Sequence, residues 1–177
     1  GIGHVRYPTA GGAGKEFAQP MYVNSPYGIS LAHNGNLTNS HELGIQLFHA
    51  EMRHLNTDSD SEVLLNIFAH ELGKQREIYP KPEHIFKAVS KTHRRCDGAY
   101  AVIAVITGHG ILAFRDNNGI RPLSIGIREG KTRDEYIVAS EDAMFSSQGF
   151  KKLRDVGPGE AIFIDKNGKF TSQQCAD

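Results

Sequence analysis

The sequence predicts a mixed α+β fold in which largely antiparallel sheets are covered by a block of helices. Five apolar segments in the second half of the chain follow one another with no more than one short helix expected among them, and strands connected in this way pair antiparallel. Helical periodicity is confined to residues 39–92. The chain has 177 residues, of which 39% are hydrophobic and 23% charged. These values are typical of a single globular domain with a substantial core.

The first part of the chain predicts short strands and a loop. Residues 1–5 have the character of a strand end, whereas residues 11–17 are rich in glycine and other small side chains, which favours a loop. Residues 21–23 and 28–32 are short apolar segments separated by the turn signal Asn24-Ser25-Pro26. We therefore expect two short strands before the first helix.

Three helices are expected between residues 39 and 92. Asn39 and Ser59 are favourable N-cap residues, and each is followed three positions later by a glutamate, which is the spacing of a capping box. Pro82 suits the first turn of the third helix. The expected buried stripes are Leu43, Leu47 and Ala50 with Phe48 and Leu55; Leu64, Ile67, Phe68 and Leu72; and Ile85, Ala88, Val89 and Thr92.

The second half of the chain predicts strands. Residues 99–106 form a continuous apolar run rich in β-branched side chains and bounded by glycines, which favours a buried strand. Further strands are expected at 111–114, 120–127, 136–140 and 160–164, with hairpin turns at 116–119 and 165–168 and a short helix at 142–148.

Composition excludes several classes of function. Lys+Arg and Asp+Glu both number 20, so the formal net charge is zero and gives no electrostatic basis for binding nucleic acid or an anionic membrane. The sequence has no apolar stretch of 18 residues and no signal peptide. Its two cysteines cannot build a disulfide framework, which favours a reducing, cytoplasmic location. The nine histidines lack the spacing of a zinc site, so we expect no metal or cofactor in this domain.

Arg6 is the first candidate binding residue, because it lies where the expected strand gives way to a loop. A guanidinium there can hold a carboxylate through two parallel hydrogen bonds, although a salt bridge at a strand end is the commoner role. The glycines at 11, 12 and 14 let the following loop move. That loop is either a lid over a ligand or an ordinary surface loop.

Asn34 and Gly35 are candidates for an oxyanion hole. A side-chain amide beside a backbone N–H with no Cβ in the way supplies two convergent donors. Asn-Gly is also the commonest dipeptide of tight turns. A hairpin turn should be followed by a strand, however, and here the sequence predicts a capped helix instead. This context weakens the turn interpretation.

Asp60 is the third candidate, at the expected start of the second helix. Capping and the helix dipole account for Ser59 and Glu62 but do not require Asp60. Its carboxylate can instead accept a substrate ammonium. Arg6 for a carboxylate, Asp60 for an ammonium and an oxyanion hole between them would suit an α-amino acid with a reactive side-chain carbonyl.

Several motifs together resemble the class II glutamine amidotransferases, and within them the amidophosphoribosyltransferase family. The motifs are HVRYPT at 4–9, AHNGNLTN at 32–39 and SDSE at 59–62, supported by YVNSPYG at 22–28, GAY at 98–100, FRDNNGIRPL at 114–123 and VASE at 138–141. The resemblance covers essentially all 177 residues. It implies the N-terminal-nucleophile hydrolase fold, a four-layer αββα sandwich, here truncated at its N-terminus. It also implies that residues 1–177 form a partial glutaminase domain.

The resemblance also implies roles for the candidate residues. Arg6 would bind the glutamine α-carboxylate with Thr9 beside it, and Asp60 would bind the α-ammonium with help from the Gly35 region. Asn34 and the Gly35 N–H would form the oxyanion hole. The loop after Arg6 would close over glutamine.

The chain departs from the family at the nucleophile, which in the family is an N-terminal cysteine. Gly1 cannot serve, and neither Cys96 nor Cys175 is N-terminal. We therefore expect a fragment at both ends, with the nucleophile upstream, and predict no glutaminase activity for this chain alone. The phosphoribosyltransferase domain, with its phosphoribosyl pyrophosphate and Mg²⁺ sites, would lie downstream. The family further implies a homo-oligomeric parent.

Two alternative functions remain open from the sequence. One is a non-catalytic amino-acid-binding module in which the nucleophile was lost. The other is the glutaminase domain of a hexosamine-phosphate synthase, a branch that usually shows Trp-Ala-Thr where this chain has Tyr7-Pro8-Thr9.

Overall fold

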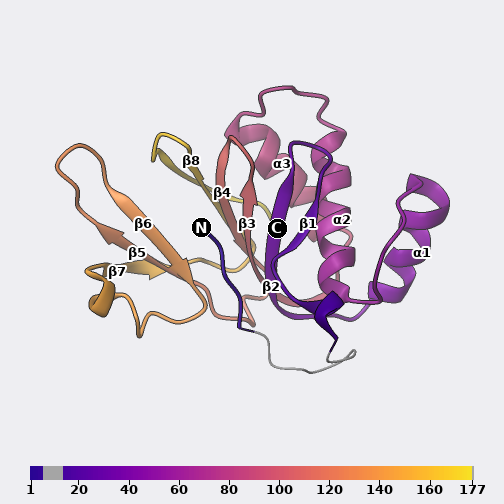
Figure 1. Cartoon of the computed structure of the whole chain (residues 1–177), viewed down its shortest axis with the longest axis horizontal. Helices are drawn as coiled ribbons and strands as arrows, with labels where there is room; N and C mark the ends of the chain where they lie inside the picture. The colour runs from indigo at the N-terminus through magenta and orange to yellow at the C-terminus, as the bar shows by residue number, and fades with distance from the viewer. Residues whose placement is uncertain (6–13, 177) are drawn as a thin grey trace.

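The computed structural model describes residues 1–5 and 14–176, which form two antiparallel sheets and a helical layer (Figure 1). The six-stranded sheet has the order β1-β2-β3-β4-β8-β9, and the three-stranded sheet has the order β6-β5-β7. The expected α+β class with antiparallel sheets is confirmed. The strands are β1 (Met21–Val23), β2 (Ile29–Leu37), β3 (Gly98–Ile106), β4 (Gly110–Arg115), β5 (Ser124–Arg128), β6 (Glu135–Ala139), β7 (Lys151–Asp155), β8 (Glu160–Asp165) and β9 (Phe170–Gln174).

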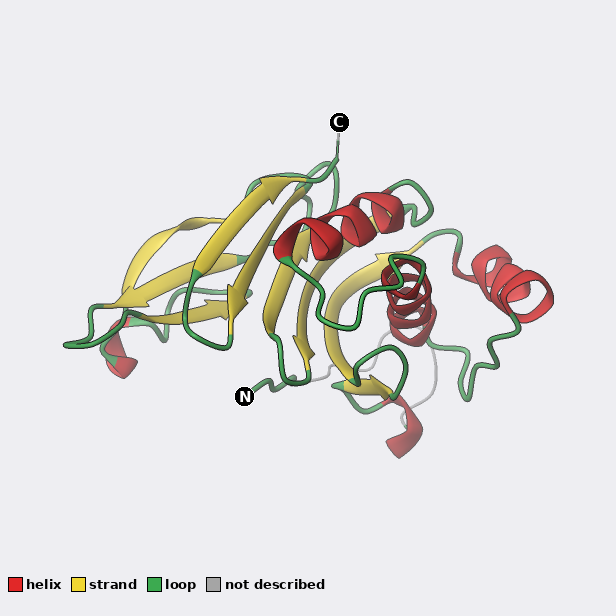
Figure 2. Cartoon of the chain, turned by 90° about the horizontal axis from the view of Figure 1, so that it is seen from above, coloured by secondary structure: helices red, strands yellow, loops and turns green. Residues whose placement is uncertain are grey.

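Three α-helices lie on the side of the six-stranded sheet that faces away from the three-stranded sheet (Figure 2). They are α1 (Ser40–Glu51), α2 (Asp60–Gly73) and α3 (Pro82–His93), and two 3-10 turns, η1 (Lys15–Phe17) and η2 (Ser146–Gln148), complete the elements. α2 is buried along most of its length because it lies between the sheet and the other helices. α1 contacts mainly α2 and projects from the edge of the molecule (Figure 1).

Strand alternation divides the apolar residues between two cores. Along β3, Tyr100, Val102 and Ala104 face the helices, whereas Ala101 faces the three-stranded sheet. The second core is smaller and is built from Ala101, Ala113, Leu123, Ile125, Val156 and Ile162. Successive side chains of a strand point to opposite faces, so this pattern places one sheet between the helices and the other sheet. The described residues thus supply one helical layer and both sheets of the expected sandwich.

The helix positions are confirmed, but two expected capping contacts are wrong. The Asn39 side chain makes no capping bond to α1; it instead bonds the carbonyl oxygen of Arg95 and the carboxylate of Asp97. The Glu62 carboxylate accepts four hydrogen bonds from Asn56 and Thr57 in the preceding loop, and its pKa is lowered because these bonds outweigh the effect of burial. Both side chains therefore tie loops to the helices.

The buried stripe of α1 is narrower than the sequence predicts. Leu43 and Leu47 are buried, whereas Phe48 is 55% exposed and Ala50 is exposed as well. The reason is that α1 packs mainly on α2, so only one narrow strip of its surface is covered. In α3 the expected residues Ile85, Ala88, Val89 and Thr92 are all buried.

Several strand boundaries differ from the prediction. Residues 1–5 form no strand, and the predicted helix at 142–148 is reduced to the 3-10 turn η2. β2 continues to Leu37 rather than ending near residue 32, and β5 begins at Ser124 because residues 116–121 form a separate loop. β7 and β9 were not predicted, since Lys151–Asp155 and Phe170–Gln174 are polar and largely solvent-exposed. No helix in the described ranges is long and apolar enough to cross a membrane.

Candidate active site

An open pocket of about 530 Å³ lies at the edge of the six-stranded sheet, where β2 extends beyond its short neighbour β1. β1 pairs only with residues 29–31 of β2, so the rest of that edge is free to face the pocket. The pocket brings together the middle of β2, the start of α2, the N-terminal segment and the loop after β4. Its lining residues are His4, Val5, Gln19, His33, Asn34, Gly35, Asn36, Ser59, Asp60, Ser61, Ala99, Ile120 and Arg121.

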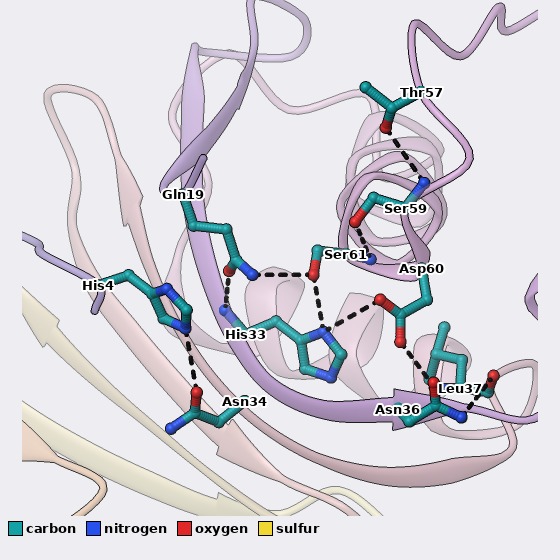
Figure 3. Close-up of polar contacts among 10 residues, drawn as sticks. All are labelled: His4, Gln19, His33, Asn34, Asn36, Leu37, Thr57, Ser59, Asp60 and Ser61. Carbon is teal, nitrogen blue, oxygen red and sulfur yellow. Dashed lines mark hydrogen bonds and ion pairs between the residues drawn. The ribbon is translucent and has the colours of Figure 1, made fainter. Parts of the chain in front are cut away.

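Side chains, rather than another strand, bind the N–H groups along this edge of β2. The His33 N–H donates to Gln19 Oε1 at 2.6 Å, and the Leu37 N–H donates to Asp60 Oδ2 at 3.0 Å (Figure 3). N–H groups alternate between the two edges of an antiparallel strand. The N–H of Gly35, midway between these two, therefore points to the same edge and into the pocket.

Gly35 is also a point where β2 and β3 approach each other closely. It lies opposite Tyr100 in the register and has φ of +142°. A Cβ at this position would lie 1.9 Å from the carbonyl oxygen of Ala99, so no other residue fits without moving the backbone. The structure thus excludes a tight turn at Asn34-Gly35: the dipeptide lies inside a strand, and glycine is required by packing.

Asn34 lies on the opposite face of β2 from His33. Its side-chain Oδ1 is 3.0 Å from Nε2 of His4, which belongs to the N-terminal segment (Figure 3). An amide oxygen can only accept a hydrogen bond, so His4 Nε2 is the donor. The Nδ2 end of the amide is left to donate elsewhere.

Asp60 is the first residue of α2 and points back to β2. Oδ2 accepts the Leu37 N–H, while Oδ1 lies 4.0 Å from Nδ1 of His33. The Ser59 side chain caps the helix by accepting the Ser61 N–H, which leaves the Asp60 carboxylate free of a capping role. Its side chain is 21% exposed, so the carboxylate is accessible from the pocket.

His33 is a buried, neutral residue behind the pocket. Burial lowers the pKa of its imidazole to about 4, against the opposing effect of the Asp60 carboxylate, and the Arg121 charge adds to the lowering. Its Nδ1 lies 3.0 Å from Ser61 Oγ, which also accepts from Gln19 Nε2 at 3.1 Å. A neutral His33 does not neutralise Asp60. Within the described ranges, His33 is also the only basic group within 4.0 Å of that carboxylate.

A tight loop at residues 116–121 forms the pocket rim on the side of the three-stranded sheet. Asp116 is fully buried, and its carboxylate accepts backbone N–H groups from Tyr100, Asn118, Ile120 and Arg121. The guanidinium of Arg115 bonds the carbonyl oxygens of Gly119, Arg121 and Val156. These contacts hold the backbone of Ile120 and Arg121 at the pocket.

The structure brings together the predicted residues Asn34, Gly35 and Asp60, while Arg6 and Thr9 lie outside the described residues, as does most of the predicted lid. Other polar residues of the pocket were not predicted, among them His4, Gln19, His33, Ser61 and Arg121. One signal could have identified His33. It continues the core-facing alternation of Ile29 and Leu31, at a position where an apolar residue is expected.

Neither cysteine lines the pocket. Cys96 and Cys175 are both buried and unpaired with each other. Burial raises the pKa of the Cys96 thiol to about 12 and that of the Cys175 thiol to about 11. Since the thiolate is the reactive form, both are inert at neutral pH.

Comparison with known families identifies the domain. A family model described as a glutamine amidotransferase domain matches residues 12–147, which is most of the chain. The chain belongs to this family. The pocket lies within the matched region except for the N-terminal segment, so we refer to it as the amidotransferase pocket.

Individual relatives of this amidotransferase domain are amidophosphoribosyltransferases. The enzyme of Pseudomonas aeruginosa is 56% identical over 176 residues, which is 99% of this chain and 35% of that protein. The Escherichia coli enzyme is 58% identical over 178 residues, which is 100% of this chain and 35% of that protein. The chain thus spans about a third of the length of these relatives.

Solved structures support the same relationship. The glutamine phosphoribosylpyrophosphate amidotransferase of Bacillus subtilis, complexed with ADP and GMP, matches with a TM-score of 0.76 and 33% identity, covering 97% of this chain and 34% of that one. A structure described as the allosteric regulatory enzyme of purine biosynthesis matches with a TM-score of 0.77 and 35% identity, again covering 97% of this chain and 34% of that one. The N-terminal-nucleophile hydrolase fold expected from the sequence agrees with these neighbours.

Proposed function

We propose that residues 1–177 form the glutamine-binding part of an amidophosphoribosyltransferase glutaminase domain. The observation that carries this proposal is the open edge of β2. There the Gly35 N–H and the Asn34 amide reach the same pocket as the Asp60 carboxylate. The high identity to amidophosphoribosyltransferases favours this branch over a hexosamine-phosphate synthase.

In this proposal each group recognises one part of L-glutamine. Asp60 binds the α-ammonium, because its carboxylate is accessible and the neighbouring His33 is neutral. The Asn34 amide and the Gly35 N–H stabilise the oxyanion that develops on the side-chain carbonyl. Arg6 and Thr9 bind the α-carboxylate, and the loop that follows them closes over the ligand.

We assign the attacking thiol to a cysteine outside these 177 residues, since both cysteines of this chain are buried away from the pocket. In the whole protein, ammonia released from glutamine would displace pyrophosphate from phosphoribosyl pyrophosphate at a second domain that uses Mg²⁺, giving 5-phosphoribosylamine, the first committed step of purine synthesis. We further propose that the protein is homo-oligomeric and cytoplasmic. Its unpaired cysteines suit a reducing compartment such as the cytoplasm.

Calorimetry with L-glutamine on the 177-residue chain tests the binding proposal. Asp60→Asn is expected to weaken binding about 10-fold or more, because it removes a charge-assisted contact to the ammonium. Arg6→Ala should have a similar effect through the carboxylate. Asp58→Asn is the matched control, because exposed Asp58 lies two residues away and does not line this pocket.

A ligand without the α-ammonium makes the test specific. 4-Carbamoylbutanoate retains the carboxylate and the amide of glutamine, so its affinity should be the same for the native chain and for Asp60→Asn. If Asp60→Asn weakens both ligands equally, Asp60 acts on the pocket as a whole and the assigned role is wrong.

Turnover tests the assignment of the nucleophile. The 177-residue chain incubated with L-glutamine should release no glutamate above the hydrolysis blank. Sustained glutamate release by this chain would contradict the proposal that the nucleophile lies elsewhere.

A further inference from the structure

The orientation of the Asn34 amide decides what the pocket offers a ligand. Its two ends have nearly the same shape, but Nδ2 is a donor and Oδ1 an acceptor. A developing oxyanion needs the Nδ2 end, and it would be repelled by the Oδ1 end. The contact that holds the other end of the amide therefore determines whether Asn34 can serve.

His4 makes that contact. His4 Nε2 lies 3.0 Å from Asn34 Oδ1, across 30 residues of sequence, and both residues line the pocket. Figure 3 shows the imidazole above the amide, with the amide nitrogen turned away from the ring. Because the oxygen accepts, Nε2 must carry a hydrogen.

The second nitrogen of His4 supports the same tautomer. Nδ1 is buried and has no hydrogen-bond partner within the part of the chain that the structure describes. A buried N–H without a partner is rarer in proteins than a buried acceptor without one. These contacts place the hydrogen of a neutral His4 ring on Nε2 and leave Nδ1 bare.

We propose that His4 is a positioning residue whose Nε2–H holds Asn34 Oδ1 and thereby turns the Asn34 Nδ2 donor toward the reacting carbonyl. The catalytic consequence rests on the proposed glutaminase function, whereas the orientation itself does not. In the opposite tautomer, Nε2 would accept from Asn34 Nδ2, and the amide oxygen would face the substrate. A proton position on His4 thus sets the polarity of one side of the pocket.

Nitrogen NMR of the imidazole rings tests the orientation independently of function. In the ¹⁵N-labelled 177-residue chain at mildly alkaline pH, the His4 ring should show a protonated Nε2 and an unprotonated Nδ1. Its signals are assigned by their loss in His4→Gln. A neutral His4 protonated on Nδ1 would overturn the proposal, whatever the chain binds.

Kinetics of the full-length protein test the consequence. His4→Leu removes the donor and should lower kcat for glutamine hydrolysis about 10-fold or more with little change in KM, because an oxyanion contact acts in the transition state. His4→Gln places an amide donor at similar reach and should restore most of the loss. In an Asn34→Ala background, His4→Leu should add no further loss. His41→Leu on the exposed surface of α1 is the matched control and should leave both kcat and KM unchanged.

The outcomes separate the two proposals. If Asn34→Ala lowers kcat but His4→Leu does not, the role of His4 is overturned while the glutaminase function stands. If the native full-length protein hydrolyses no glutamine, the proposed function fails, and the tautomer measurement alone decides the orientation.

Discussion

Gly35 combines two requirements at one residue. Its N–H faces the amidotransferase pocket, while the position of its missing Cβ is occupied by the backbone of β3. The facing residue Tyr100 turns its own N–H away, to Asp116 Oδ2. Such non-hydrogen-bonded pairs are the closest pairs of an antiparallel ladder. The glycine that exposes the donor is therefore also the one that lets the two strands meet.

Gly35→Ala should lower the free energy of unfolding by about 3 kcal/mol, because the added methyl group would overlap the Ala99 carbonyl and the positive φ would be strained. Gly108→Ala is the matched control. Gly108 also has a positive φ, but a Cβ there meets nothing within 4 Å, so only the conformational cost of about 1 kcal/mol remains. Urea unfolding measures both values, and similar losses in the two variants would argue against the steric explanation.

Two buried histidines make stability depend on pH. The pKa values of His33 and His93 are each lowered to about 4, chiefly by burial. Between pH 6.5 and 4 the unfolded chain therefore binds protons that the folded chain does not. Stability present above pH 6.5 is lost as the pH falls, by at most about 3 kcal/mol for each histidine.

Urea midpoints at pH 7.5, 6 and 5 measure this dependence. The native chain should unfold at progressively lower urea concentration, and His33→Gln and His93→Gln should each reduce the steepness of the trend. A double variant with the same pH dependence as the native chain would rule out these two residues as its source.

At the residue scale, side chains with one distinctive chemical use are the easiest to single out in a sequence. Asn34, Gly35 and Asp60 were predicted because an oxyanion hole and an ammonium site need those groups, and all three line one pocket. His4 and His33 were missed because their importance depends on contacts across 28 or 30 residues of sequence. No local pattern reports such contacts.

At the scale of single elements, an ionic cluster adds to the apolar contacts of Leu43 and Leu47 that attach α1. Arg95, in the loop after α3, bonds Glu51 Oε1 of α1 at 2.7 Å and Glu71 Oε1 of α2 at 2.8 Å. These side chains are between 6% and 18% exposed, so the ion pairs are only weakly screened by solvent. One guanidinium thereby links α1 and α2.

Arg95→Met should cost about 2 kcal/mol of stability, because it removes the guanidinium from two poorly solvated carboxylates. Among the described residues, Glu71 then keeps only Lys74 and Glu51 only His70 as a basic partner. Hydrogen exchange should show the largest loss of protection in α1. Arg128→Met is the control, since the Arg128–Glu135 pair is about half exposed (47% and 51%) and should contribute less than about 1 kcal/mol. Unchanged protection of α1 in Arg95→Met would refute the proposed attachment.

The accuracy of the element predictions follows the amount of burial. α2, α3 and β3 were predicted well because each has a strong apolar pattern that tertiary packing reinforces. β7 and β9 were missed because their residues are mostly polar, and pairing with a neighbouring strand defines them instead. The extension of β2 was missed because Asn34 and Gly35 favour turns in isolation.

At the scale of the whole molecule, the loop at 116–121 joins the two sheets at the pocket. It carries the chain from β4 of the six-stranded sheet to β5 of the three-stranded sheet. The carbonyl oxygen of Asp116 also accepts the Gly159 N–H, which fixes the turn between β7 and β8 to the same point. The geometry of the pocket rim therefore depends on how the sheets are joined.

Asp116→Asn should lower both stability and affinity for L-glutamine. The amide replaces an acceptor that faces several N–H groups, at a cost of about 2 kcal/mol, and the rim residues Ile120 and Arg121 lose their support. Asp165→Asn is the control, because Asp165 organises a comparable turn far from the pocket by accepting the N–H groups of Asn167 and Lys169. Asp165→Asn should lower stability and leave the affinity for L-glutamine unchanged. Equal loss of glutamine affinity in both variants would contradict a local role of the Asp116 loop.

The short length of β1 has a further consequence, for self-association. An uncovered strand edge with free N–H groups is a template on which another chain can add a strand and begin to aggregate. Here Gln19 and Asp60 occupy the N–H groups on either side of Gly35, so an incoming strand finds only one donor in three available. The same two side chains that shape the ligand site thus protect the edge of the sheet from intermolecular pairing.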